Sequence, residues 1–558
     1  MPADGPDLMK QYERGKSERS LFAVHWERQA HLLAPSRVGI IRQYPQGAIQ
    51  TSQLFDSTTP MAAELAAHFI AGQVLSPAQQ WGRMSMAHPA VVGDDDTQEW
   101  LDESRDRQLR LYAESLFYAE ATEGLIDWIA FGTGHFIQEE AARSPEQRGG
   151  GFRGLACRAT RTGRFVIYDG PNGLVDTSFE ERKMTASAIQ RQWPTGKLPE
   201  LITRAIAAGK GSEVFTIIHA VAPRPVGSQR TGAGATAMPW LSAWIEERSK
   251  QVIYESGYRV FPAAVPRYQR TPGETYGRGR GDLAYPTSWT LNQAVQMSFQ
   301  DWALKIQPPV LARHNAVFGS LRLVPAGLST IDTHGGKIED ALRPWQTGSH
   351  PEVSQIKEEE LRKTINQVFY VQQILDLMQI QKSEMTAFEY GKKLALLFGL
   401  IGPVYGRLMR EFLTQLWNVT FDLLLHGGVF SPPPPAVYST DGKIDVIFEN
   451  PISRSQKAGE AEALGMVLND LQLLFQDDPT QATAYLKWLD PKEVMPGLLE
   501  VRGVPVRWRR SREDVDALEQ AEAQAASAQQ QLVDAHTLAS AAGKAAPMVQ
   551  ALQPAGTA

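Results

Sequence analysis

The sequence predicts an α+β protein that is mainly helical, and two observations carry that prediction. In the second half of the stretch from Lys382 to Gly428, apolar residues recur every three or four positions, which is the spacing of one face of a helix. Between residues 132 and 270, β-branched and aromatic residues instead alternate or cluster between Gly and Pro, which is typical of strands. We therefore expect a β-rich region set among helices.

Composition limits what the chain can do. Its 558 residues suffice for several domains and a substantial core, and its formal net charge is −6. Tight binding of nucleic acid is not expected, since it requires Lys and Arg to neutralise phosphates, but nucleic acid can still slide past. The longest apolar run, Leu394 to Ile401, is too short to span a bilayer, and the N-terminus shows no secretory signal. The single cysteine, Cys157, excludes an internal disulfide framework and a cysteine-based zinc site, and suits a reducing cytoplasm.

Three helices are expected before the β-rich region. Residues 7–34 form a charged helix, residues 55–84 contain a second that Asp56 or Ser57 caps, and a third spans about residues 97–131. The bulky side chains expected to place the third helix in the core are Trp100, Leu109, Phe117, Leu125 and Trp128.

Within residues 132–270, one helix is expected at about residues 185–209, interrupted at Pro194. Two glycine-rich loops, at residues 231–238 and 276–283, superficially resemble nucleotide-binding fingerprints. Neither lies in a suitable strand–turn–helix unit, so both are expected to be surface loops.

The stretch after Lys382 is expected to form a long, half-buried helix. Its apolar face consists of Ile401, Tyr405, Leu408, Phe412, Leu416, Val419 and Leu423. Its opposite face consists of Arg407, Arg410, Glu411, Thr414, Asn418 and Asp422. Gly402 and Pro403 are expected to bend the helix, because Pro403 donates no backbone hydrogen bond.

No pattern in the sequence predicts catalysis. The phosphate-binding GxxxxGK[ST], the zinc-binding HExxH and the nucleophile motif GxSxG are absent from the sequence. His314, His334 and His350 lie in or near one short segment; they are metal ligands if folded together, or solvated loop side chains, which we favour. The acidic run Glu358 to Glu360 is expected to be solvated at a helix start, where the helix dipole favours carboxylates. We expect no enzyme, no cofactor and no metal site.

Several segments then occur together in a specific order. They are FDSTTPMAAELAAHFIAGQVLSPAQQW, FGTGHFIQEE, GYRVFPAAVPRYQRTPGETYGRG followed by LNQAV, MTAFEY, and LIGPVYGRLMREFL before a proline run. In this order and spacing, over about residues 10–515, the chain resembles the head-to-tail connector, or portal, proteins of short-tailed (podovirus-type) tailed bacteriophages. The insert at residues 225–240 and the Ala- and Gln-rich C-terminal tail depart from the pattern.

This resemblance implies a portal fold with wing, stem, clip and crown parts, assembled as a ring around a central channel. The parts would be the N-terminal wing at 1–285 (helical over 7–131, β-rich over 132–270), a stem helix at 286–307, the clip at 308–353, a second stem helix at 354–377, a tunnel loop at 378–384, a long kinked wing helix and strand at 385–450, the crown at 451–535, and a disordered tail at 536–558.

The resemblance also implies two sites, neither of them catalytic. The tunnel loop would line the DNA channel with Met378, Gln379, Ile380, Gln381, Lys382, Ser383 and Glu384. The clip would present Arg313, His314, Arg322, His334 and Lys337 to the terminase and the tail adaptor.

By the same resemblance the expected function is mechanical. A ring, usually a dodecamer, would occupy one capsid vertex of the virion, pass double-stranded DNA during packaging and ejection, and hold the tail. The expected partners are further copies of the chain, DNA, terminase, the tail adaptor, and the major capsid and scaffolding proteins, with assembly in the host cytoplasm and no membrane. The alternatives are another oligomeric capsid or tail scaffold without a DNA channel, and a hydrolase with a non-contiguous site.

Overall fold

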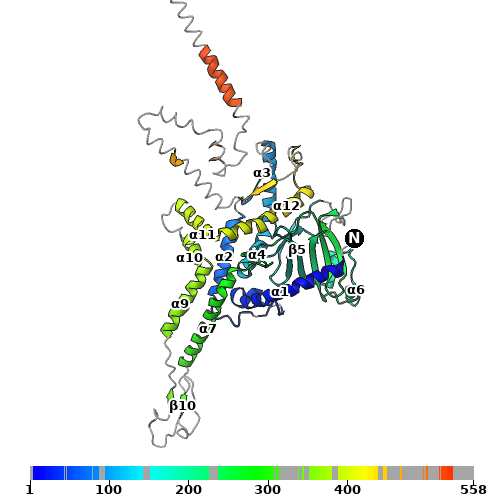
Figure 1. Ribbon diagram of the computed structural model, residues 1–558. Coiled ribbons are helices and arrows are strands. Elements are labelled where there is room, and N and C mark those ends of the chain that lie inside the picture. The colour runs from blue at the N-terminus through cyan, green and yellow to red at the C-terminus, as the bar shows by residue number, and fades with distance from the viewer. Residues whose placement is uncertain are drawn as a thin grey trace, which may run out of the picture. The chain divides into compact units, whose positions relative to one another are not determined.

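The computed structural model describes most of the chain up to residue 448 and short parts beyond it. The described residues are 4–42, 44–45, 47–48, 50–77, 80–86, 95–142, 151–224, 237–306, 310–312, 337, 342–344, 351–379, 387–435, 437, 444–448, 465–467, 494–495, 498–499, 515 and 517–531. The chain divides into two compact units. The first comprises Met1–Met84, Glu103–Pro432 and Asp445–Ser455, and the second Ser85–Asp102, Pro433–Ile444 and Gln456–Ala558. Almost all described elements belong to the first unit, which combines helices with antiparallel sheets as the predicted α+β class requires (Figure 1).

A five-stranded antiparallel sheet dominates the β-rich region. Its strands in spatial order are β4 (Phe165–Asp169), β5 (Val175–Thr185), β6 (Val214–Pro223), β7 (Trp240–Glu246) and β8 (Val252–Tyr258). The N-terminal helix α1 (Gly5–Leu33), predicted at residues 7–34, lies against one face of the sheet (Figure 1). There Met9 and Tyr12 are buried against a row that the register aligns across four strands, Val166, Phe179, Ala220 and Ala243.

The central strand β6 is buried on both faces, which explains its nearly unbroken apolar sequence. On the face opposite α1, the helices α5 (Ala186–Gln192) and α6 (Glu200–Ala207) bury Ile189 and Ile202 against the sheet. The two helices confirm the interrupted helix predicted at residues 185–209. Thr185 caps α5, because its hydroxyl oxygen accepts a hydrogen bond from the Ala188 amide at 3.3 Å.

A three-stranded antiparallel sheet completes the β-rich region. Its central strand β2 (Phe136–Glu140) pairs with β3 (Leu155–Ala159) on one side and β9 (Ala263–Ala264) on the other. The helix α4 (Phe117–Phe131) contacts both β2 and β3. This smaller sheet therefore joins the helical part of the unit to the larger sheet.

Polar side chains are buried where the two sheets meet. Arg158 of β3 donates two hydrogen bonds to the Glu180 carboxylate of β5, at 2.8 and 2.6 Å. Burial raises the pKa of Glu180, but the charge and hydrogen bonds of Arg158, with a hydrogen bond to His219, outweigh it and hold that pKa well below its ordinary value. Nearby, the fully buried ring of His135 stacks on Phe165 with 4.8 Å between ring centres, and burial lowers the pKa of His135 to about 4.

The second predicted helix is α2 (Thr58–Val74). Asp56 caps it, because its carboxylate accepts a hydrogen bond from the Thr58 amide at 2.8 Å, whereas Ser57 makes no side-chain cap. Of the two capping residues that the sequence leaves open, the structure selects Asp56.

The sequence predicted one continuous helix at residues 97–131. This prediction is wrong, because the chain forms two helices there, α3 (Asp95–Glu114) and then α4. The Ser115 hydroxyl separates them: it donates to the Tyr112 carbonyl at 3.1 Å and accepts from the Phe117 amide at 3.2 Å. Of the bulky residues predicted in the core, Trp100, Phe117, Leu125 and Trp128 are buried, and Leu109 is half-buried.

The long helix predicted after Lys382 is divided into α11 (Ala387–Leu408), one π-helical turn η5 (Met409–Leu413) and α12 (Thr414–His426). Its predicted apolar face is confirmed: Ile401, Leu408, Phe412, Leu416 and Val419 are buried, and Tyr405 and Leu423 half-buried. Gly402 and Pro403, where a bend was expected, lie inside α11, as a kinked helix allows. The irregular turn comes later, where the Thr414 amide bonds to the Met409 carbonyl, one residue further back than in an α-helix.

Two antiparallel helices, α7 (Arg280–Ile306) and α9 (Pro351–Val368), lie side by side and extend away from the sheets (Figure 1); we call this pair the stalk. Between them in sequence, the short strands β10 (Val310–Ala312) and β11 (Leu342–Pro344) pair with each other. The stalk helix expected to begin at Pro286 starts earlier. The Asp282 carboxylate caps its first turn by accepting a hydrogen bond from the Gly279 amide at 2.8 Å.

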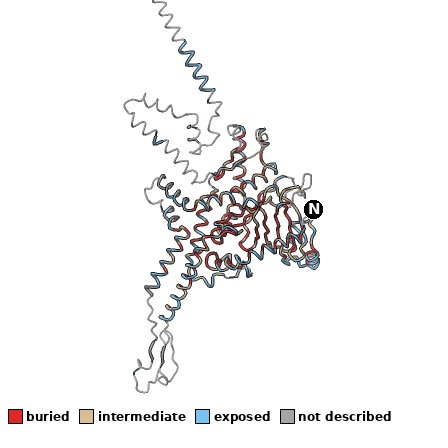
Figure 2. The backbone as a smooth tube through the Cα atoms, in the orientation of Figure 1, coloured by how far each residue is buried: buried red, intermediate tan, exposed pale blue. Residues whose placement is uncertain are grey.

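The helix predicted at residues 354–377 is also interrupted. The chain forms α9 and then α10 (Val371–Gln379), because Tyr370 adopts a φ of +57° and so leaves the right-handed helical region. Buried residues concentrate in the sheets and the helices packed on them, and exposed residues in the stalk (Figure 2).

The remaining strands are β1 (Arg83–Met86) and β12 (Ile444–Ile447), at which the two units divide. In the second unit, residues 517–531 form an exposed helix, as predicted for the start of the Ala- and Gln-rich tail. Most of the predicted crown at 451–535, and all of the tail at 536–558, lie outside the described residues.

Candidate functional site

The residues predicted to form the two sites fall mostly outside the described part of the chain. Met378 and Gln379 end α10, whereas Ile380, Gln381, Lys382, Ser383 and Glu384 lie outside the described residues. Among the predicted clip residues, Lys337 is exposed, and Arg313, His314, Arg322 and His334 lie outside the described residues, as does His350. The stalk that leads to both segments is described.

The stalk carries an exposed apolar stripe. Toward the sheets, Leu291 and Val295 of α7 are buried. Further along the same face, Phe299 is 52%, Trp302 49% and Ile306 78% exposed. All five residues belong to the face that the helical spacing predicts to be apolar. Half of that face therefore has no covering element in the described part of a single chain.

Polar contacts join the two stalk helices to each other and the stalk to the start of α2. The Ser298 hydroxyl of α7 donates to the Glu358 carboxylate of α9 at 2.6 Å. The Arg362 guanidinium of α9 pairs with Asp56, the cap of α2, at 2.9 Å. Glu358 is only 8% exposed, so the prediction that residues 358–360 are all solvated is wrong for this member; Glu359 and Glu360 are exposed as expected.

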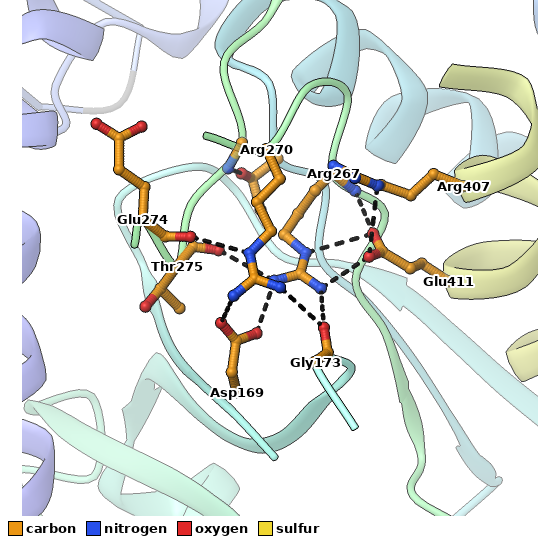
Figure 3. A network of polar contacts seen from close by, with 10 residues as sticks. Asp169, Gly173, Arg267, Arg270, Glu274, Thr275, Arg407 and Glu411 are labelled. Atoms are coloured by element: carbon orange, nitrogen blue, oxygen red, sulfur yellow. Dashed lines mark hydrogen bonds and ion pairs between the residues drawn. The ribbon is translucent and has the colours of Figure 1, made fainter. Parts of the chain in front are cut away.

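A buried guanidinium joins three segments beside the long helix. Arg267, whose side chain is 0% exposed, follows β9 and lies at the centre of Figure 3. It pairs with Asp169 at the end of β4 at 2.6 Å and with Glu411 of η5 at 2.7 Å. Its guanidinium also donates to the Gly173 carbonyl, in the turn after β4, at 2.7 Å, and its backbone amide donates to Glu411 at 2.8 Å. We call this set the Arg267 junction.

Further arginines surround the Arg267 junction. Arg270 pairs with the second oxygen of Asp169 at 2.7 Å, and the Nε of Arg407 lies 4.0 Å from Glu411 (Figure 3). Burial lowers the pKa of Arg267, but the hydrogen bonds and charge of Glu411 and the charge of Asp169 outweigh it and hold that pKa above its ordinary value. The two carboxylates therefore favour the charged form of Arg267.

The sequence did not single out the Arg267 junction. Glu411 was placed on the polar face of the long helix, and that placement is correct, but its side chain is 8% exposed. The missing information is the position of Arg267 and Asp169, which are 144 and 242 residues away from Glu411 in the numbering. The one local signal is a charged residue, Asp169, directly before the turn formed by Gly170, Pro171, Asn172 and Gly173.

The groups that could hold a metal ion or act as a nucleophile among the described residues are arranged as follows. In the part of the chain that the structure describes, no group of three or more His, Cys, Asp or Glu side chains is arranged to hold a metal ion. Burial raises the pKa of the Cys157 thiol to about 12, so it is not an activated nucleophile. The charged groups of the Arg267 junction are paired with one another. These pairs join the segments that carry Arg267, Asp169 and Glu411.

Comparison with known proteins finds a family model, two relatives from phages and a solved structure. A family model described as "Bacteriophage head to tail connecting protein" matches residues 6–508. The "Probable portal protein" of Bordetella phage BPP-1 is 25% identical over 509 residues, which cover 88% of each chain. The "Portal protein" of Salmonella phage epsilon15 is 21% identical over 531 residues, covering 94% of this chain and 92% of that protein. A chain from the virion of a native gene transfer agent particle is 13% identical with a TM-score of 0.31, over 73% of this chain and 87% of that one.

Proposed function

The chain belongs to the family of bacteriophage head-to-tail connecting proteins, whose family model matches residues 6–508, and on that premise we propose that it is the portal of a phage virion. Copies of the chain assemble into a ring at one capsid vertex. Double-stranded DNA enters through this ring during packaging and leaves through it during ejection. The ring docks a terminase first and a tail adaptor later, beside the major capsid and scaffolding proteins.

The exposed apolar stripe of the stalk carries the assembly part of this proposal. Phe299, Trp302 and Ile306 continue a face whose other half, Leu291 and Val295, is buried. A contiguous apolar surface of this kind marks an interaction site. When the same contact is repeated head to tail and closes, it produces cyclic symmetry. A neighbouring copy is therefore the natural cover for the stripe, and we propose a ring of twelve copies.

The order of the elements supports the assignment of parts. We propose that α7 and α9 are the two stem helices, that residues 308–353 between them are the clip, and that residues 378–384 are the tunnel loop. The wing then comprises the two sheets with α1 to α6, α11 and α12, and the crown follows residue 451. The clip residues Arg313, His314, Arg322, His334 and Lys337 are proposed to meet the terminase and the tail adaptor.

The tunnel loop is proposed to contact DNA in the channel. Its glutamines and Ser383 offer weak, reorientable hydrogen bonds, Met378 is a flexible apolar side chain, and Lys382 adds one positive charge per subunit. A ring of lysines centres a DNA duplex, while the net charge of −6 per chain keeps the duplex from binding tightly.

We propose no catalytic activity for the chain itself, so that the energy for packaging comes from the terminase. Of the helices that the structure describes, none combines the length and the apolar character needed to cross a membrane. Assembly is proposed to take place in the host cytoplasm.

Native mass spectrometry and negative-stain microscopy of the purified chain test this proposal. We expect closed rings with a central hole. The variant Phe299→Ser/Trp302→Ser should assemble far less completely, because it removes the apolar cover between copies. Leu21→Ser, at a residue of α1 that is 81% exposed, is the control and should assemble normally. A stable monomer of the unmodified chain would contradict the proposal and favour the hydrolase, and sheets or fibres would favour another scaffold.

A further inference from the structure

The break between α9 and α10 is an unusual piece of backbone. Tyr370 has a φ of +57°, a region that L-residues other than Asn, Asp and Gly rarely occupy. Its amide bonds to the Gln367 carbonyl at 3.2 Å, and its own carbonyl accepts from the Ile374 amide at 3.0 Å. α9 therefore ends and α10 begins within two residues. Glycine would occupy this position without strain, yet the sequence has a tyrosine there.

Contacts of the Tyr370 side chain explain why a tyrosine occupies this position. Arg280, the first residue of α7, donates a hydrogen bond to the Tyr370 hydroxyl, and its guanidinium lies 4.5 Å from the centre of the Tyr370 ring. The same guanidinium lies 5.6 Å from the Tyr268 ring and donates to the Tyr268 hydroxyl at 2.7 Å. Tyr268 is in turn buried against Trp128, with 4.9 Å between ring centres. Arg280 thus ties the strained residue to the core.

Among the residues that the structure describes, Arg280 makes these contacts without an acidic partner. No carboxylate lies within salt-bridge distance of it among the described residues, although most arginines around it, such as Arg267, Arg270 and Arg278, are paired. Cation–π contacts and hydrogen bonds to hydroxyl groups are weaker than a buried ion pair. The contacts of Arg280 with Tyr370 are therefore comparable in strength to the backbone strain at Tyr370. Because they are no stronger than that, they can break.

A continuous helix is the alternative arrangement of this segment. If Tyr370 returned to the right-handed region, α9 and α10 would form one helix, and the left-handed strain would disappear. Against this change stand the Arg280 contacts and the burial of Phe369, Val371 and Ile374, which are 1%, 7% and 2% exposed. α10 also packs on α2 and α11, so straightening moves it relative to both.

We propose that Arg280 and Tyr370 form a latch that holds the α9–α10 break, and that its opening lets the two helices straighten into one. The inference concerns the chain itself and does not depend on the ring or on DNA. With such a latch, the angle between the stalk and α10 has two states. The contact between the Arg280 guanidinium and the Tyr370 ring decides between them.

Spin-label distances in the full-length protein test the latch. In a Cys157→Ala background, labels at Ser354→Cys on α9 and Gln373→Cys on α10 occupy exposed positions. In a continuous helix they would be about 29 Å apart along the axis, at about 1.5 Å per residue. Sparse labelling prevents distances between copies. We expect one population, at a separation shorter than in the straight form, for the otherwise unmodified chain.

Two substitutions at one position separate the latch from mere packing. Tyr370→Ala keeps the left-handed strain and removes the anchor, so at least a third of the molecules should move to the longer distance. Tyr370→Gly removes the anchor and the strain together, so the distance should stay short. Arg280→Gln should behave like Tyr370→Ala, whereas Arg278→Gln, which removes a neighbouring arginine paired with Glu274, should change nothing.

The outcomes are distinct. Short distances in Tyr370→Ala and Arg280→Gln would overturn the proposal, because packing alone would then hold the break. Long distances in Tyr370→Gly would also overturn it, because release would not depend on strain. Circular dichroism and the urea unfolding midpoint of each variant establish that the protein is folded. A variant that does not fold is replaced by Tyr370→Phe, which removes the hydroxyl contact and should give a smaller shift of the same sign.

Discussion

Arg267 and Glu411 lie 144 residues apart in the chain, and their side chains meet at 2.7 Å with the guanidinium wholly buried. The pair ties the segment after β9 to the π-helical turn of the long helix. With Asp169 on its other side, Arg267 joins the larger sheet to that helix.

Removing the carboxylate from this pair should destabilise the protein. Glu411→Gln removes one of the two carboxylates that pair with the buried Arg267 guanidinium among the described residues. Asp169 still pairs with it, so the cost should stay below the about 3–5 kcal/mol that follows when a buried charge loses its partner entirely. Urea unfolding followed by tryptophan fluorescence measures the change. Glu360→Gln removes a fully exposed carboxylate paired with Lys357 and is the control; its midpoint should not change measurably. An unchanged midpoint for Glu411→Gln would show that the Arg267 junction contributes no stability.

His135 should make the protein sensitive to mild acid. In the folded state its pKa is about 4 against an ordinary 6.5, so folded His135 stays neutral while the unfolded chain takes up a proton. Stability should therefore be full above pH 6.5 and fall by about 1.4 kcal/mol per pH unit as the pH drops from 6.5 to about 4.

The variant His135→Phe should lose this part of the pH dependence, since a phenyl ring keeps the stack on Phe165 and does not titrate. Urea midpoints measured between pH 7.5 and pH 4 compare the two proteins. His68→Gln, at an exposed histidine, is the control and should keep the slope of the original chain. An identical slope in His135→Phe would contradict the prediction. The Glu180 carboxylate, whose pKa is depressed, should add a separate loss at lower pH.

Gly132 should tolerate no side chain. It ends α4 with a φ of +88°, and a Cβ atom there would lie 2.4 Å from the backbone of Arg278 and of Gly279. Gly132→Ala should cost about 1–2 kcal/mol for the left-handed conformation and a further 1–3 kcal/mol for overpacking. Gly209 has a φ of +73°, and a Cβ atom there would meet nothing within 4 Å, so Gly209→Ala should show the backbone cost alone. Equal melting temperatures for the two variants would contradict the steric argument.

Lys382→Glu tests the proposed tunnel loop. We expect normal rings and normal empty heads, because the proposed tunnel loop is a short connection between two helices and would contribute little to the core. Packaging or retention of DNA should be impaired, since the substitution replaces a ring of positive charges by negative ones facing the phosphates. Packaged DNA per particle, measured against Lys210→Glu at an exposed position of the β-rich region, decides the matter. Unimpaired packaging in Lys382→Glu would remove the tunnel-loop assignment.

The sequence was informative where local chemistry sets local structure. Helical spacing identified the apolar face of the long helix, and Asp56 was correctly among the two candidates for the cap of α2. The interruption near Pro194 followed from the inability of proline to continue a helix. In each case the deciding residues lie within one or two turns of each other.

Elsewhere the deciding contacts come from distant parts of the chain. Tyr370 takes a left-handed conformation without a glycine to signal it, because Arg280 anchors its side chain from another helix. Glu411 reads as solvated by periodicity alone, and only the position of Arg267 makes it a buried partner.

The Arg267 junction is also expected to form late in the folding of the chain. Asp169 and Arg267 are separated by 98 residues, and Glu411 by a further 144, so the entropy lost in closing the second loop adds to that of the first. Pairings of such long range form late, after strands that neighbour each other in sequence have already associated. Glu411→Gln should therefore act mainly on the unfolding rate and leave the refolding rate of the larger sheet nearly unchanged. On a growing polypeptide, the Arg267 guanidinium would lack its Glu411 partner until the long helix has been synthesised.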